Sequence, residues 1–170
     1  MGKASTKENK NMYHISREEL GLTREKASEL LECISADKLE KIENQGVIPH
    51  PEDVLVMAEK YKKPTLCNYY CSKECAIGQK YVPHIEIKDL SQIVLEMLSS
   101  LNGIERNKDR LIDITADGMI NDDEIADLIK IQNQLERISI TVETLQLWVE
   151  KMRANGFIDE DRYNEIKNRN

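Results

Sequence analysis

The residues with the most distinctive chemistry in this sequence are three cysteines that fall within nine positions of one another. Cys67, Cys71 and Cys75 recur at a spacing of four, in a chain that has 4 cysteines in all. Thiolates bind Zn²⁺ or an iron–sulfur cluster, and three close thiolates require a fourth ligand. The candidates for that ligand are Cys33, His50, His84 and a residue of a second subunit. One interpretation of this stretch is therefore a metal or redox site. The alternative, which the absence of a Cys-x-x-Cys pair favours, is that these are small buried hydrophobic residues.

A second stretch, which begins at Asp113, has the residue types of a calcium loop. It resembles an EF-hand loop that ends at Glu124, but Thr115 stands where an acidic or amide oxygen is usual. The same residues fit a turn between two helices, in which Gly118 follows the first helix and Asn121 caps the second with Glu124 as its partner. Since capping explains them with fewer assumptions, we interpret this stretch as a helix–helix turn.

The sequence offers no recognisable catalytic centre. Its histidines, at positions 14, 50 and 84, lie beside no nucleophile motif, and the G-x-S-x-G, H-E-x-x-H and glycine-rich phosphate-loop motifs are absent. The many carboxylates fall at positions that a helix exposes to solvent. We therefore expect a protein that is not an enzyme.

The composition favours an all-α protein. The 170 residues are 40% hydrophobic and 32% charged, with 7 Gly and 4 Pro, which is too few for a loop-rich β fold or a disordered chain. The sequence contains no run of about eighteen apolar residues, so we expect no membrane span. The polar start, Met1 to Asn11, lacks the apolar segment of a signal peptide. We expect a cytoplasmic protein whose cysteines are thiols or metal ligands.

The charge is distributed unevenly along the chain. Residues 1–83 contain 13 basic and 13 acidic residues, whereas residues 84–170 contain 11 and 18, so the second half carries the whole net charge of −7. An acidic segment repels the phosphate backbone of nucleic acids. Any contact with nucleic acid should therefore lie in the first half.

The second half contains two long stretches in which apolar residues alternate spacings of four and three, the pattern of a coiled-coil seam. They run from about Asp89 to Ile114 and from Asn121 to about Ala154. The seam residues are Leu90, Val94, Met97, Leu101, Ile104, Lys108 and Leu111 in the first stretch, and Leu128, Ile131, Leu135, Ile138, Val142, Leu145, Val149 and Met152 in the second. We expect the two seams to bury each other in a long antiparallel α-hairpin.

A short final helix, from about Asp159 to Lys167 with Asp159 as its cap, should follow this hairpin. The second long helix also has an apolar set, Ile140, Leu147 and Trp148, away from its seam. An isolated pair of helices buries too little surface to be stable, so we expect the hairpin to form a homodimer. The alternative is that this set packs on the tail or on the first domain.

The first half has the pattern of several short helices. A capped helix is expected after Thr23, with Ala27 on its inner face, and Ser35 caps a second helix from Ala36 to Asn44. Two short helices around a tight turn, flanked by further helices, form a helix-turn-helix domain.

Over residues 13–66 the sequence resembles the Cro/C1-type (XRE) helix-turn-helix proteins, which are typically transcriptional regulators. The matching residues are Leu22, Thr23, Ala27, Leu30, Leu31, Ile34, Ser35, Leu39, Ile42, Glu43, Gly46, Pro49, Leu55 and Ala58. The turn departs from the family, because Glu32-Cys33-Ile34 stands where a Gly and a small apolar residue are usual, with one residue extra.

The resemblance implies that the helix from Ala36 to Asn44 is a recognition helix for double-stranded DNA. The residues implied to approach DNA are Thr23, Arg24, Ser35, Ala36, Lys38 and Lys41. Thr23 and Arg24 would approach a phosphate at a helix N-terminus, and Lys38 and Lys41 would contact base edges or backbone. Asp37 and Glu40 lie in the same helix and oppose such contacts.

We therefore expect an all-α protein with three parts: a helix-turn-helix domain at residues 13–66, a Cys-rich connector at 67–84, and an α-hairpin dimerisation or regulatory region with a short C-terminal helix at 85–170. The expected function is sequence-specific DNA binding and transcription regulation by a homodimer, because two linked recognition helices read two half-sites. A zinc or iron–sulfur site in the connector could modulate it. The alternative is a protein-interaction adaptor that keeps the helix-turn-helix fold without binding DNA.

Overall fold

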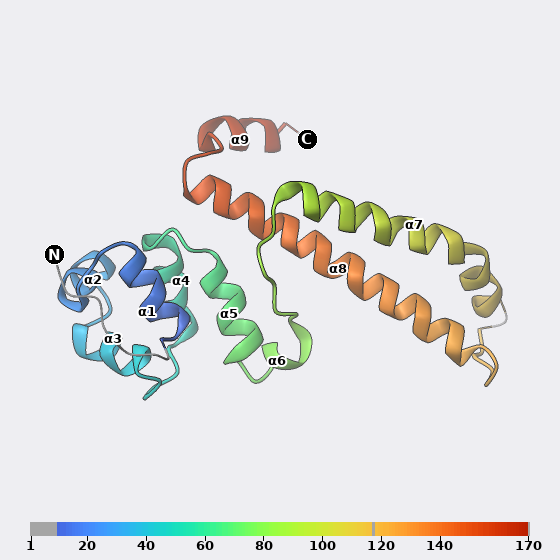
Figure 1. Ribbon diagram of the computed structural model, residues 1–170, viewed down its shortest axis with the longest axis horizontal. Helices are drawn as coiled ribbons and strands as arrows, with labels where there is room; N and C mark the ends of the chain where they lie inside the picture. Colours follow the sequence, from blue (N-terminus) through green and yellow to red (C-terminus); the bar gives the residue numbers. More distant parts are fainter. Residues whose placement is uncertain (1–9, 117, 170) are drawn as a thin grey trace. The chain divides into compact units, whose positions relative to one another are not determined.

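The computed structural model (Figure 1) describes residues 10–116 and 118–169, and in these residues the chain is all-α, without a strand. The expected fold class is confirmed. The helices are α1 (Met12–Glu19), α2 (Arg24–Leu31), α3 (Ala36–Glu43), α4 (Pro51–Lys60), α5 (Thr65–Lys73), α6 (Gly78–Tyr81), α7 (Leu90–Thr115), α8 (Ile125–Ala154) and α9 (Glu160–Lys167). None of these described helices has both the length and the apolar character that a membrane span needs.

The described residues fall into two compact units. One comprises the residues up to His84 together with those from Val149 onward, and the other is Ile85–Trp148.

Side-chain caps fix where the first helices begin. The side chains of Asn11, Thr23 and Ser35 accept hydrogen bonds from the backbone N–H three residues on, at 3.0, 3.3 and 3.2 Å. Each satisfies one N–H group that the first turn of a helix leaves without a partner. The predicted caps at Thr23 and Ser35 are confirmed. At α4, Pro51 occupies the first turn and the backbone N–H of His50 donates to Asp53 Oδ2 at 3.0 Å.

A single core joins α1–α5. Its fully buried side chains are Tyr13, Ala27, Leu31, Ile34, Leu39, Ile42, Val54, Met57, Ala58, Tyr61 and Leu66. The inner-face positions predicted for the two helices of the helix-turn-helix are thus buried. Leu30, one of the family-matching residues, is 38% exposed instead.

The expected connector is largely helical. Residues Thr65–Lys73 form α5, whose Leu66 lies in the core and whose Tyr69 meets the Tyr13 ring edge-on at 5.6 Å between centroids. The Tyr13 hydroxyl also donates to Glu74 Oε2 at 2.7 Å. The cysteine spacing of four is therefore the spacing of one side of a helix, and this helix packs on the first four helices because its apolar residues complete their core.

The extra residue in the turn between α2 and α3 is absorbed at Glu32. Its φ is +60° and its ψ −44°, and the N–H of Cys33 donates to the carbonyl of Leu31 at 2.6 Å. This three-residue turn takes the place of the usual glycine, and it lets α3 begin at its Ser35 cap.

The long helices α7 and α8 lie side by side in opposite directions (Figure 1). Asn107 Nδ2 donates to Gln134 Oε1 at 3.1 Å, and Arg110 Nε donates to Asp127 Oδ2 at 2.9 Å. The seam residues expected to face each other are partly open to solvent instead, with Leu101 48% and Leu135 51% exposed. The prediction of two mutually buried apolar seams is therefore not confirmed along their whole length, because the seam residue Ile131 is only 3% exposed whereas Leu101 and Leu135 remain about half exposed.

The turn after α7 has one of the expected contacts, but Asn121 does not cap α8, and the C-cap of α7 is Ala116, two residues before Gly118. Gly118 has a φ of +73°, and Glu124 Oε2 accepts from the backbone N–H of Asn121 at 3.0 Å. Helix α8 begins at Ile125, four residues later than expected, and Asp117 of the calcium-loop pattern lies outside the described residues. Further along, Asp159 caps α9 as predicted, because its side chain accepts from the N–H of Arg162 at 2.7 Å.

Candidate functional site

The exposed face of α3 is held in place by a carboxylate at the end of the helix. Glu43 is only 2% exposed and makes a two-pronged ion pair with Arg17 of α1. Arg17 Nε donates to Oε1 at 2.5 Å and Nη2 donates to Oε2 at 2.8 Å. Paired parallel hydrogen bonds of this kind fix both distance and orientation. The pair therefore sets how α3 is rotated against α1.

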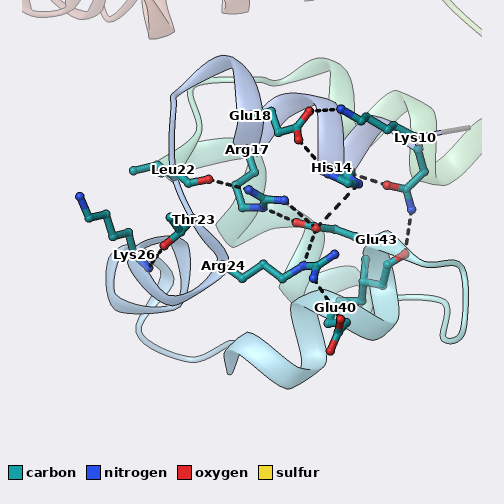
Figure 2. A network of polar contacts seen from close by, with 12 residues as sticks. Lys10, His14, Arg17, Glu18, Leu22, Thr23, Arg24, Lys26, Glu40 and Glu43 are labelled. Carbon is teal, nitrogen blue, oxygen red and sulfur yellow. Dashed lines mark hydrogen bonds and ion pairs between the residues drawn. The ribbon is translucent and has the colours of Figure 1, made fainter. Parts of the chain in front are cut away.

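Several further polar groups converge on the same carboxylate (Figure 2). Arg24 Nε, from the start of α2, donates to Glu43 Oε2 at 2.9 Å, and its Nη1 donates to Glu40 Oε1 at 3.0 Å. Arg17 Nη1 donates to the carbonyl of Leu22 at 2.5 Å. His14 Nδ1 lies 3.9 Å from Glu43 Oε2. Three helices are thus joined through one buried anion.

The electrostatics of this network favour the ionised carboxylate. Burial opposes ionisation of Glu43 and would raise its pKa, but hydrogen bonds from Arg17 and Arg24 outweigh burial and hold that pKa below its ordinary value. The hydrogen bond to Glu43 raises the pKa of Arg17 above its ordinary value. A buried ion pair contributes to stability only when such hydrogen bonds replace the lost water. Here both charges have them.

Most of the residues expected to approach DNA already have a partner within the chain. Thr23 and Ser35 cap α2 and α3, and Ala36 is half-buried in the first turn of α3. Arg24 is occupied by Glu40 and Glu43. Lys38 Nζ pairs with Asp53, at 2.9 Å to Oδ1 and 2.7 Å to Oδ2. Lys41 is exposed.

The exposed face of α3 therefore has little net charge. Asp37, Glu40 and Lys41 are all exposed on it, and the positive charge of Lys38 is offset by Asp53. The structure brings Arg24 onto this face beside Glu40, at 3.0 Å. Sequence reasoning placed Arg24 toward a phosphate and did not foresee these carboxylate partners.

Glu43 and Arg17 were missed as site residues. Glu43 follows the inner residue Ile42 in the sequence, so a charged residue next to a buried position was the available signal. That signal is weak, because a carboxylate at the end of a helix is most often solvated. Its partner Arg17 is 26 positions away, and Asp53 is 15 positions from Lys38.

The three cysteines lie on α5 and the residues just after it. All three are half-buried, Cys75 Sγ accepts from the N–H of Gly78 at 3.5 Å, and burial raises the pKa of the Cys67 thiol. Over residues 10–116 and 118–169, no three His, Cys, Asp or Glu side chains converge as a metal site would require.

The proposed fourth ligands lie in different settings. Cys33 is exposed in the α2–α3 turn, and His50 precedes α4. His84 Nδ1 is 3.1 Å from Ser72 Oγ. Among the described residues the structure therefore does not assemble the expected zinc or iron–sulfur site, because Cys67 and Cys71 lie on α5 whereas Cys75 lies beyond its end.

Comparison with known proteins gave no matching family model, no matching curated protein and no matching solved structure.

Proposed function

We propose that the protein binds double-stranded DNA through α3 and regulates transcription as a homodimer. The observation that supports this most is the fixed presentation of α3. The helix is capped by Ser35, its inner residues Leu39 and Ile42 are buried, and Glu43 anchors its end to Arg17 and Arg24. A short rigid helix with an exposed outer face has the dimensions that fit a major groove.

The charges on this face predict modest affinity. Lys41 is the exposed cation of α3, while Asp37 and Glu40 repel phosphates. Arg24 becomes available to a phosphate when its contact with the exposed carboxylate of Glu40 opens, and its contact with buried Glu43 keeps it in position. Non-specific binding depends on the number of phosphates that cations neutralise, so it should be weak and easily lost in salt.

A homodimer would contact more base pairs than a single recognition helix can. A single recognition helix contacts only a few base pairs, whereas two related by a two-fold axis read half-sites about one DNA turn apart. Selective binding by this protein should therefore need two chains on one duplex.

The test is selection of bound fragments from a pool of genomic DNA, followed by binding titrations of the enriched fragments at several salt concentrations. We expect Lys41→Ala to weaken binding several-fold and to reduce the slope of log affinity against log salt by about 1. Glu40→Gln should strengthen binding, because it removes a negative charge from the face and frees Arg24.

Lys73→Ala is the matched control, since Lys73 is also exposed but lies on α5. It should bind like the wild type. Absence of binding at low salt, or equal losses in the Lys41 and Lys73 variants, contradicts the proposal.

The second candidate is a protein-interaction adaptor. It is favoured by the pairing of Arg24 and Lys38 with carboxylates, which leaves the α3 face close to neutral. In that case Glu40→Gln does not create DNA affinity, and the enriched pool shows no common sequence.

A further inference from the structure

Helices α7 and α8 bury the apolar side chains of Ile93, Ile114 and Ile131, which are at most 3% exposed, and polar and small residues also meet between them. Asn107 donates to Gln134, Arg110 pairs with Asp127, and a Cβ added to Gly103 would lie 3.4 Å from the side-chain nitrogen of Gln134. Asp127, Gln134 and Thr141, which is 6% exposed, follow one another at heptad spacing. We call these residues the inner seam. Its polar pairs fix how each helix is rotated, but they bury little apolar surface.

The apolar heptad residues lie one position beyond the inner seam. In α8 they are Leu128, Leu135 and Val142, and in α7 they are Val94, Met97 and Leu101, which continue the heptad register of the positions that follow Gly103, Asn107 and Arg110. Leu135 is 51%, Leu101 48%, Val94 41% and Val142 39% exposed. We call these six residues the outer face.

Both halves of the outer face lie on the same side of the α7–α8 pair. One residue forward along an α-helix is a rotation of about 100°. Because α7 and α8 run in opposite directions, a forward step of one residue from the inner seam turns away from the partner toward the same side in both helices. The stripes of Leu101 and of Leu135 therefore form one continuous apolar surface.

The charge pattern separates this surface from the rest of the unit. Residues 85–148 contain 6 basic and 13 acidic residues. At the positions that follow the inner seam by one residue, from Val94 to Leu111 and from Leu128 to Val142, Lys108 is the only charged residue. A surface with a single charged residue in so acidic a segment is suited to apolar contact.

Its dimensions meet the minimum that a specific dimer needs. At 1.5 Å per residue, the positions from Val94 to Leu111 extend over about 26 Å along α7, and two helices side by side are about 20 Å wide. The face therefore offers about 500 Å² per chain, or about 1,000 Å² for two copies, which is the lower limit for a specific protein–protein interface.

We propose that a second copy of this chain covers the outer face, so that two α7–α8 pairs form a four-helix bundle about a two-fold axis. Each copy's Leu101 and Leu135 stripes pack on the same surface of the other copy. This identifies the surface behind the homodimer of the proposed function and rests on that function only for its biological purpose, since self-association through this face does not require DNA.

The test is the mass of the full chain in solution, measured by light scattering or sedimentation across a wide range of protein and salt concentrations. We expect twice the chain mass of 19.6 kDa. Dimerisation should strengthen as salt rises, because salt screens the repulsion between two acidic bundle halves. DNA binding weakens as salt rises, so failure of this proposal and failure of DNA binding are separate results.

The variant Leu101→Lys/Leu135→Lys should be monomeric, and the milder Leu101→Gln/Leu135→Gln should raise the dimer dissociation constant at least tenfold. The matched control is Leu95→Lys, because Leu95 is 67% exposed on α7 but lies off the outer face. Helical circular dichroism identifies any variant that fails to fold, and the glutamine pair then decides. A monomeric wild type, or a Leu95 variant as impaired as the outer-face variants, overturns the proposal.

Discussion

The two compact units of this protein differ in how completely they bury their apolar side chains. In the first, Leu39, Ile42 and Leu66 are at most 1% exposed and belong to one continuous core. In the second, Ile93, Ile114 and Ile131 are at most 3% exposed, but Leu101 and Leu135 stay about half exposed. The comparison teaches that an amphipathic pattern guarantees a helix but not a partner within the same chain.

The ion pairs of the two units differ in the same way. The side chains of Arg17 and Glu43 are 8% and 1% exposed, whereas those of Arg110 and Asp127 are 40% and 33% exposed. An exposed pair competes with water and is screened by salt, so it contributes little. A buried pair cannot lose one partner without leaving a desolvated charge behind. The following predictions use these contrasts.

The largest expected effect comes from Glu43→Ala. Removing this carboxylate leaves Arg17 buried without its partner, and the free energy of unfolding should fall by about 3–5 kcal/mol. Hydrogen exchange measured by mass spectrometry should show the loss of protection in α1–α3. The control is Glu29→Ala, an exposed position on α2, which should change stability very little. Similar losses in the two variants would mean that the buried network does not fix α3.

A smaller difference in stability is expected between alanine substitutions at two glycines, Gly78 and Gly103. A Cβ at Gly78 would clash with the backbone carbonyl of Cys71, so Gly78→Ala should cost about 1–3 kcal/mol, as overpacking does. Gly103→Ala in α7 meets only the flexible end of Gln134 and should stabilise the helix by up to about 1 kcal/mol. Thermal unfolding followed by circular dichroism measures both. Opposite signs are required, and equal shifts would contradict the close packing of α5 against α6.

Two buried tyrosines provide a finer comparison. Tyr13→Phe removes the hydrogen bond to Glu74 and should cost about 1–2 kcal/mol. The Tyr61 hydroxyl is buried and has no hydrogen-bond partner among the described residues, so Tyr61→Phe should be neutral or slightly stabilising. Urea unfolding of the two variants under one set of conditions gives the difference. A larger loss for Tyr61→Phe would show that its hydroxyl is bonded in solution.

The smallest expected effect is a change in how steeply the folding stability depends on pH. Because the pKa of folded Glu43 lies below its ordinary value of 4.5, its contribution is present above that value and is lost as the pH falls through the lower folded pKa. Glu74 has the opposite sign, because burial raises its pKa despite the hydrogen bond from Tyr13, so its contribution is lost as the pH rises through the raised value. Stability measured against pH should become flatter on its acid side in Glu43→Gln and keep its slope in Glu29→Gln.

Much of the local structure could be predicted from the sequence. Thr23, Ser35 and Asp159 cap helices where they were expected, and Gly118 in the turn after α7 has a positive φ. These features depend on residues within one turn of each other, so the sequence contains all the partners. Cys67 and Cys71 lie on a helix that packs on the first four, because Leu66 and Tyr69 of the same helix contact the core.

The candidate site could be predicted only in outline. The position of α3 and the burial of Leu39 and Ile42 follow from periodicity. The ion pairs of Arg24 with Glu40 and Glu43, and of Lys38 with Asp53, do not follow from periodicity. A long cationic side chain can reach many carboxylates, and only the assembled helices decide which one is nearest.

The sequence by itself determined the helices of this protein, their caps and the two apolar stripes of α7 and α8, because each arises from interactions between residues a few positions apart. Tertiary structure alone decided that Glu43 is a buried anion shared by Arg17 and Arg24, and that α7 and α8 meet through Asn107 and Gln134. The physical reason is that a rotation by one residue, about 100°, exchanges an apolar contact for a polar one without disturbing a single hydrogen bond within the helix.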